Sequence, residues 1–376
     1  MRLAVEQAPF ATWLKRTANV ADTRSPALLN SSLLLDVSAD QRLTLWATND
    51  LYSITGEIPL FACDDGSGAI ATDASRLSDL VASSRTDVPV GLLYNPGEPR
   101  LRVSSGRATA KLPVSDPAAL PRFTTPFDVD PQLFLSAKEL AAALAFTAPA
   151  IGRSPDQAQL WGVAFNFDPT DGGAAFAAAQ EGRLGAVWQL DATGEAFATT
   201  LLPRPLCHQL WRFCKDEETQ IAITFTSRAV RIATPEWTII SKIVDSEPPR
   251  WNLWLPPRCA QPVTVDSAEL AAALERVEAV AEIDNKRLNS RGALLTFDSG
   301  TILLRDAKST IEDEVAAHFV GAPERVGVNI QHLLTIIKTI GAKTIELHTD
   351  GPERAIRVQA TDDPRGAFVT ASYRIS

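Results

Sequence analysis

The chain has little cysteine and histidine, with four of each among its 376 residues. Its cysteines (Cys63, Cys207, Cys214 and Cys259) form no paired-spacing motif, so the sequence predicts reduced thiols in a cytoplasmic protein. It contains no apolar run that approaches the length needed to cross a bilayer, and its beginning, MRLAVEQAPFATWLKR, has no signal-peptide pattern. The sequence therefore predicts neither export nor membrane insertion.

Motifs for catalysis are also missing. The glycines near residues 65–68 and 171–173 are typical of turns, because no Lys-Ser/Thr of a phosphate loop follows them. There is no nucleophile elbow and no His-Glu-x-x-His. Cys207 and Cys214 share one face of an expected helix, which favours core packing over a zinc site with His208. We expect no enzymatic activity, cofactor or metal, since an enzyme would need a cleft with converging titratable groups.

The formal net charge of -9 argues, taken alone, against a nucleic-acid partner. The charge is uneven, however, because six expected helical segments hold 14 Lys and Arg against 11 Asp and Glu. These segments are 9–22, 73–85, 136–153, 203–216, 266–287 and 327–343. A relatively basic helical face and an acidic remainder would attract phosphates to the helices, although segment 266–287 is locally acidic.

Internal repeats divide the chain into three. The hexapeptide Glu139–Leu144 recurs as Glu269–Leu274, each copy after a short alternating segment, and the same strand-then-helix order opens the chain around Leu14. A second helical element and an apolar–basic–apolar strand follow in each third. Proline-rich connectors at 120–131 and 255–262 then predict domains 1–125, 126–258 and 259–376. Three similar domains in a row favour an arc that symmetric dimerisation could close.

Several motifs occur in the order of a known family. They are MRLAVE with Leu14 and Arg24, Thr48–Leu51 with one inserted residue, Ser105-Gly106-Arg107 with Leu112, Ser241–Asp245 with Pro249 and Leu255-Pro256, Arg291-Gly292, and Tyr373-Arg374-Ile375. Through them the whole chain resembles the beta subunit of bacterial DNA polymerase III, the sliding clamp. The resemblance implies an α+β fold of three clamp domains. Each has two helices on an inner face and antiparallel sheets outside, and two chains join head to tail as a ring.

The function implied by the resemblance is that of a non-catalytic processivity factor. Such a homodimer encircles double-stranded DNA without reading its sequence and binds the polymerase III alpha subunit and the clamp loader through short peptide motifs. The alternative is a divergent accessory or decoy clamp of the second-copy, plasmid, phage or drug-resistance type. Candidate DNA contacts are Lys15, Arg16, Arg24, Arg76, Arg153, Arg204, Arg212, Lys215 and Lys338, each of which could also be a solvated helix residue.

The resemblance also implies an apolar peptide pocket between the second and third domains. Its matching positions are Leu160, Ala179, Gly182, Arg183, Leu184, Pro249, Leu253, Trp254, Val369, Thr370, Ala371, Tyr373, Arg374 and Ile375. The family's Thr-Asp-Gly-His-Arg-Leu is replaced by Ala179–Leu184, and the chain ending is altered too, so the lining differs. Trp251 and Trp254 could instead only pack one domain against the next.

A dimer contact is implied in the same way. Ala110 and Leu112 would face Ala279 and Val280, and Arg107 and Lys111 would oppose the acidic residues Glu312, Asp313 and Glu314. The small side chain of Ala110, where an aromatic residue often sits, removes apolar area and predicts a weaker dimer or a dimer with a different packing. The acidic residues could also serve as a solvated strand edge that discourages aggregation.

Overall fold

The computed structural model describes the chain except for residues 22–30, 39–41, 66–67, 121–126, 169–172, 283–290, 307, 353 and 374–376. It divides into two compact units. The first comprises residues 1–134 and 219–243, and the second comprises residues 135–218 and 244–376. Strand β10 (Leu133–Ser136) lies at the division.

The first unit is built on one antiparallel sheet with the strand order β16-β17-β18-β4-β3-β2-β6-β9-β8-β7-β1-β5. Its elements are β1 (Arg2–Val5), α1 (Gln7–Ala18), β2 (Ser32–Val37), β3 (Arg42–Thr48), β4 (Tyr52–Pro59), β5 (Ala62–Asp65), β6 (Gly68–Asp73), α2 (Ala74–Ala82), β7 (Val90–Leu93), β8 (Arg100–Ser105), β9 (Ala108–Ser115), the 3-10 turn η1 (Pro117–Ala119), β16 (Gln220–Phe225), β17 (Ala229–Ala233) and β18 (Trp237–Lys242). Alternation places Leu43 and Leu45 of β3 in the core, with neighbouring residues turned outward.

The second unit has a sheet with the order β15-β11-β12-β13-β26-β25-β24-β19-β22-β21-β20-β23. Its elements are α3 (Ala137–Thr147), η2 (Ala148–Ala150), η3 (Ala158–Leu160), β11 (Gly162–Asp168), β12 (Ala174–Gln180), β13 (Leu184–Gln189), β14 (Ala192–Gly194), β15 (Thr200–Pro203), α4 (Arg204–Cys214), α5 (Trp251–Trp254), β19 (Val263–Asp266), α6 (Ser267–Val280), β20 (Gly292–Asp298), β21 (Thr301–Asp306), β22 (Glu312–His318), β23 (Glu324–Asn329), α7 (Ile330–Ile340), β24 (Thr344–His348), β25 (Ile356–Ala360) and β26 (Gly366–Thr370).

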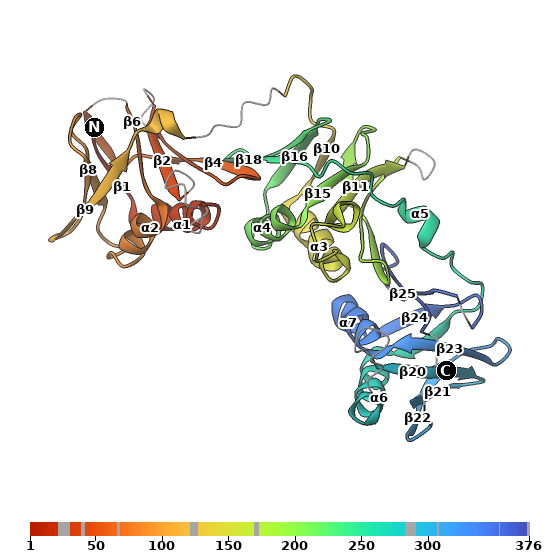
Figure 1. The fold of residues 1–376 in the computed structure, drawn as a ribbon. Helices are drawn as coiled ribbons and strands as arrows, with labels where there is room; N and C mark the ends of the chain where they lie inside the picture. The colour runs from red at the N-terminus through yellow and green to blue at the C-terminus, as the bar shows by residue number, and fades with distance from the viewer. Residues whose placement is uncertain are drawn as a thin grey trace. The chain divides into compact units, whose positions relative to one another are not determined.

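The helices pack in pairs, α1 with α2, α3 with α4, and α6 with α7 (Figure 1). Most of these helices follow a strand directly, and a short polar residue at the junction accepts a hydrogen bond from the first turn. Asp73 caps α2, Ser136 caps α3, Asp266 caps α6 and Asn329 caps α7. The equivalent leucines Leu14, Leu144 and Leu274 are all buried, as the repeat predicts.

All six expected helical segments contain a helix, but most of the helices are shorter than expected. Segment 136–153 ends its α-helix at Thr147 and continues as the turn η2. Segment 266–287 ends its helix at Val280, and residues 283–290 lie outside the described part. The short helix α5 was not expected. None of the helices in the described ranges is long and apolar enough to cross a membrane. The three-domain division stays a prediction.

Candidate functional site

A narrow hole opens in the second unit where strands β11 and β12 meet the segment before and within α5. It measures about 10 Å³, hardly more than one water molecule. Its lining residues are Gln159, Leu160, Gly162, Ala164, Ala178, Ala179, Gln180, Leu201, Pro248, Pro249 and Trp254. An adjoining hollow of about 280 Å³ shares Ala164, Ala178, Pro248 and Pro249 with it and reaches Trp251 and Arg250. Together they form a groove along β11 and β12.

Two tryptophans of α5 fix one wall of this groove. The Trp251 ring lies 4.6 Å from the Phe176 ring, centre to centre, within a cluster that includes Trp254 and Leu255. The Trp254 ring covers Gly185, where an added Cβ would come within 2.5 Å of it. The absence of a side chain at Gly185 therefore lets the indole lie flat against β13, and Trp254 both packs and lines the groove.

The turn of the β12–β13 hairpin, β13 and β26 lie next to Trp254 and outside the lining of the two hollows. Gly182 has a φ of +95°, a left-handed conformation that glycine adopts without strain, and it allows the tight turn. Leu184 pairs with Thr370 in the antiparallel ladder, and the Ala371 N–H donates to the Arg183 carbonyl at 2.8 Å. The ladder brings residues from two distant parts of the sequence together beside Trp254.

The predicted pocket residues are distributed around this groove in three groups. Leu160, Ala179, Pro249 and Trp254 line the narrow hole. A second group lies on or beside the hairpin and β26 and lines neither hollow: Gly182, Arg183, Leu184, Val369, Thr370 and Ala371. Leu253 is 79% exposed, the Tyr373 ring lies against Gly292, and Arg374 and Ile375 fall outside the described residues. Their roles in peptide binding stay predictions.

Sequence reasoning missed seven residues that line the hole. They are Gln159, Gly162, Ala164, Ala178, Gln180, Leu201 and Pro248. Most of them lie on β11, β12 or β15, which pair with one another in one antiparallel ladder. The apolar segments 162–165 and 174–179 are typical of buried strands, but nothing local indicates that β15 pairs with β11.

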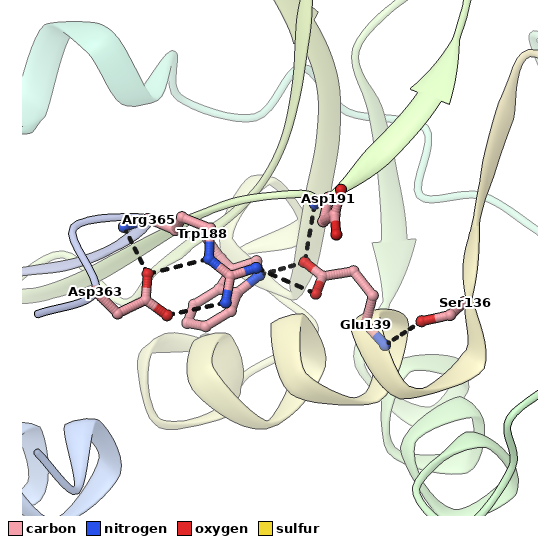
Figure 2. Close-up of polar contacts among 6 residues, drawn as sticks. All are labelled: Ser136, Glu139, Trp188, Asp191, Asp363 and Arg365. Atoms are coloured by element: carbon pink, nitrogen blue, oxygen red, sulfur yellow. Dashed lines mark hydrogen bonds and ion pairs between the residues drawn. The ribbon is translucent and has the colours of Figure 1, made fainter.

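A polar network joins α3, β13 and the β25–β26 turn (Figure 2). The Glu139 carboxylate accepts hydrogen bonds from Trp188 Nε1 at 2.8 Å and from the Asp191 N–H at 3.0 Å. It also lies 3.5 Å from Arg365 Nη1. Arg365 stacks over the Trp188 ring and forms two hydrogen bonds to Asp363, which lower the pKa of that carboxyl. Glu139 thus holds three separate segments together.

A second polar contact joins the hairpin to α7. Glu181 Oε1 lies 3.6 Å from His332 Nε2. Burial raises the pKa of Glu181 and lowers the pKa of His332, so desolvation disfavours the charged form of both partners. His332 is therefore neutral at pH 7, and its contact with Glu181 is not an ion pair at that pH.

The predicted DNA-contact residues lie mostly at the helix surfaces. Lys15 and Arg76 are exposed in the first unit, and Arg16 lies over the Trp13 ring. In the second unit the exposed residues are Arg153, Arg204, Arg212, Lys215 and Lys338. Arg204 Nη1 donates to the Gly152 carbonyl at 3.3 Å, and Lys215 lies over the Trp211 ring. Arg24 falls outside the described residues.

Helix α4 carries Arg204 and Arg212 and no acidic residue, so its exposed face is cationic. Cys207 and Cys214 of the same helix are buried, which agrees with core packing, and burial raises the pKa of Cys207 to about 12. Across the described ranges, no group of three His, Cys, Asp or Glu side chains is arranged to hold a metal ion.

The predicted dimer residues lie on β9, α6 and β22. Arg107, Lys111, Ala279 and Val280 are exposed, Ala110 is half-buried and Leu112 is buried. Two carboxylates of β22 already have partners in the chain. Asp313 binds Arg276 at 2.6 Å, which lowers the pKa of Asp313, and Glu312 binds Arg305. Glu314 is exposed.

The comparisons with known proteins agree with this fold. Residues 254–373 match the model of the DNA polymerase III beta subunit, C-terminal domain. The beta sliding clamps of Pseudomonas aeruginosa and Caulobacter vibrioides are each 24% identical, over 385 and 383 residues, with full coverage of both chains. The crystal structure of the DNA polymerase III subunit beta from Pseudomonas aeruginosa has a TM-score of 0.89 at 22% identity, and full coverage of both chains.

The fold is that of a DNA clamp. Over its whole length the chain is similar to beta sliding clamps, at 22% to 24% identity to these relatives.

The Glu139 network yields a stability prediction with a matched control. Glu139→Gln should lower the free energy of unfolding by about 1–3 kcal/mol, because the half-buried charge-assisted contacts to Trp188 and Arg365 are weakened. Glu269→Gln, at the equivalent position of the repeat, changes an exposed residue and should cost at most about 0.5 kcal/mol. Urea unfolding of both variants checks this, and equal destabilisation of the two would contradict it.

Proposed function

We propose that this chain is a cytoplasmic sliding clamp, two copies of which encircle duplex DNA and tether the polymerase III alpha subunit and the clamp loader. The observation that carries the proposal is the charge of the paired helices. Helices α1 and α4 hold Lys15, Arg16, Arg204 and Arg212 and no Asp or Glu, in a chain whose net charge is -9. Because the rest of the protein is acidic, the attraction for phosphate is concentrated on the surfaces of these cationic helices.

Sliding requires contacts that do not depend on base sequence. Lysine and arginine that reach phosphates satisfy this, since phosphate contacts carry no sequence information. Lys15, Arg212 and Lys338 are exposed on three different helices and have long, flexible side chains suited to such contacts. The proposed inner surface therefore holds DNA electrostatically, and salt weakens it.

The proposed ring is made of domains 1–125, 126–258 and 259–376 from each of two chains. Domain 1 of one copy would meet domain 3 of the other, with β9 against the end of α6. Val280 at that end is 47% exposed, an unusual exposure for a large apolar side chain. Because Asp313 and Glu312 are already paired within the chain, the interface would rest on a small apolar contact and be weak.

Partner proteins would bind the groove beside Trp254 with an extended peptide. Apolar walls from Leu160, Pro249 and Trp254 suit its anchor side chains, and Arg183 supplies a polar rim. The hole is nearly closed, so entry of a peptide requires a side chain to move. This narrowness, with the altered residues Ala179–Leu184, favours as a second candidate an accessory or decoy clamp that does not serve the main polymerase.

The ring predicts a native mass of about 81 kDa, twice the 40.6 kDa of one chain. Val280→Asp should shift the mass towards one chain at micromolar concentration, because a buried carboxylate would oppose the small apolar contact. Sedimentation velocity measures the native mass of the wild-type chain and of the Val280→Asp variant. Val320→Asp, at another exposed valine, is the control. A wild-type chain that stays at 40.6 kDa would contradict the ring.

The cationic helices predict a change in the salt dependence of DNA binding. The double variant Arg204→Gln and Arg212→Gln should reduce the steepness of log K against log salt by about 2, because two fewer cations neutralise phosphates. The control is the double variant Arg325→Gln and Arg354→Gln, at exposed arginines outside the helices. Binding to a plasmid-length duplex by fluorescence anisotropy at several salt concentrations gives the slopes. Equal slopes in the two double variants would be evidence against DNA at these helices.

The groove predicts an effect on polymerase stimulation. Trp254→Ala should reduce primer extension on loaded, primed circular DNA about tenfold, as expected for an aromatic anchor in a binding pocket. Val320→Ala, also at an apolar residue, should retain full stimulation. If Trp254 serves only to pack the domains, Trp254→Ala should lower the stability of the protein, and the folded variant should still stimulate primer extension fully. A wild-type chain that dimerises and never raises processivity favours the decoy clamp.

A further inference from the structure

Cys259 lies in the segment that leads from α5 to β19, over a polar face of β24 and β25. On β24 this face presents Glu346 and His348, and on β25 it presents Arg357 and Gln359, directly across the ladder. The Arg357 Nη1 donates to the Pro256 carbonyl at 3.1 Å. This contact holds the segment against the sheet, and Cys259 remains partly accessible to solvent.

The Cys259 sulfur is in direct contact with an imidazole. Its Sγ lies 3.4 Å from His348 Nδ1, and the backbone N–H of Cys259 donates to the same nitrogen at 3.2 Å. Because Nδ1 accepts a hydrogen bond, it is the unprotonated nitrogen of the ring, and the proton is on Nε2. The single lone pair of Nδ1 faces both the thiol and the Cys259 N–H, so uptake of the thiol proton replaces the hydrogen bond from that N–H.

The other side of the ring faces a carboxylate. His348 Nε2 lies 3.3 Å from Glu346 Oε2 but makes no well-formed hydrogen bond, although the side chain is only 3% exposed. Gln359 Nε2 donates to the same Glu346 oxygen at 2.9 Å and fixes its position. A ring that gains a proton at Nδ1 becomes cationic and is attracted to Glu346 more strongly than the neutral ring is. The carboxylate therefore stabilises the ring after it has taken the thiol proton.

The protonation of His348 reflects several neighbours. Burial lowers the pKa of His348, Arg357 and Arg258 lower it further, and Glu346 opposes them. The net direction is downward from 6.5, so the ring is neutral at pH 7 and available as a base.

We propose that Cys259 is a peroxide-sensitive thiol, with His348 as the proton acceptor and Glu346 as the residue that positions and stabilises it. The sulfur attacks one oxygen of hydrogen peroxide, an S–O bond forms and the O–O bond breaks. The thiol proton passes to His348 Nδ1 and then to the departing hydroxide, which leaves as water. The products are a sulfenic acid and water, with sulfur oxidised by two electrons and the peroxide reduced by two.

The remaining cysteines provide internal comparisons. Cys207 and Cys214 are buried within the core. Cys63 on β5 is half-buried like Cys259, and no histidine of the described ranges lies within hydrogen-bond distance of it. Accessibility alone would make Cys63 and Cys259 react alike, whereas a base at Nδ1 would make Cys259 faster.

The test treats the full-length protein with hydrogen peroxide, traps sulfenic acid with dimedone and quantifies each cysteine by peptide mass spectrometry. At pH 7 Cys259 should be labelled about ten times faster than Cys63, a modest effect for a positioned base. His348→Asn should remove this advantage and leave the rate at Cys63 unchanged. The rate at Cys259 should fall on the acid side as His348 becomes protonated, with a midpoint below 6.5.

Glu346→Gln distinguishes a positioning role from a purely structural one. Glu346 raises the pKa of His348, so its neutralisation should move the acid midpoint of the Cys259 rate to lower pH. This variant also keeps the experiment decisive if His348→Asn does not fold. Equal rates at Cys259 and Cys63, or an acid midpoint that Glu346→Gln leaves in place, would overturn the proposal.

Discussion

The antiparallel pairing of β13 with β26 supports Trp254, the side chain that lines the narrow hole and packs against β13. It joins Leu184–Trp188 to Gly366–Thr370 through the backbone hydrogen bonds of an antiparallel ladder. Backbone bonds do not depend on side-chain identity, so the position of the groove can persist while its lining changes. Trp254 uses the same strand, because its ring lies on the bare backbone of Gly185. The altered residues Ala179–Leu184 are therefore compatible with the unaltered clamp fold.

The Glu139 network also connects β13 to the turn before β26, in this case through side chains. Glu139 and Glu269 occupy equivalent positions of one repeated hexapeptide, and both lie in the first turn of a helix. Glu139 is bound by Trp188 and Arg365, whereas Glu269 is exposed. The repeat thus determines where each helix begins, and the neighbouring chain segments determine what the carboxylate does. The Glu139 network therefore adds side-chain contacts to the backbone ladder that joins β13 to β26.

The sequence predicted the helices well, because three equivalent leucines at near-constant spacing imply three buried helix faces. It predicted Leu160 and Trp254 of the groove through the family resemblance. It missed Gly162 and Leu201, which meet because β11 pairs with β15, and no local pattern encodes that pairing. It also missed α5, since four residues between prolines show no helical period. The sequence also could not predict the contact of Arg276 with Asp313, because these residues lie on different elements.

The uneven charge of the helices constrains how such a clamp can hold DNA. Helices α1 and α4 present cations alone, while α6 carries Glu269, Glu275 and Glu278 against the single cation Arg276. Arg276 is itself bound to Asp313. Attraction for phosphate is therefore concentrated on some helices and absent from others. In the proposed ring few contacts with phosphate would act at once, and each would be easily exchanged for the next phosphate along the duplex, which is the condition for sliding rather than tight binding.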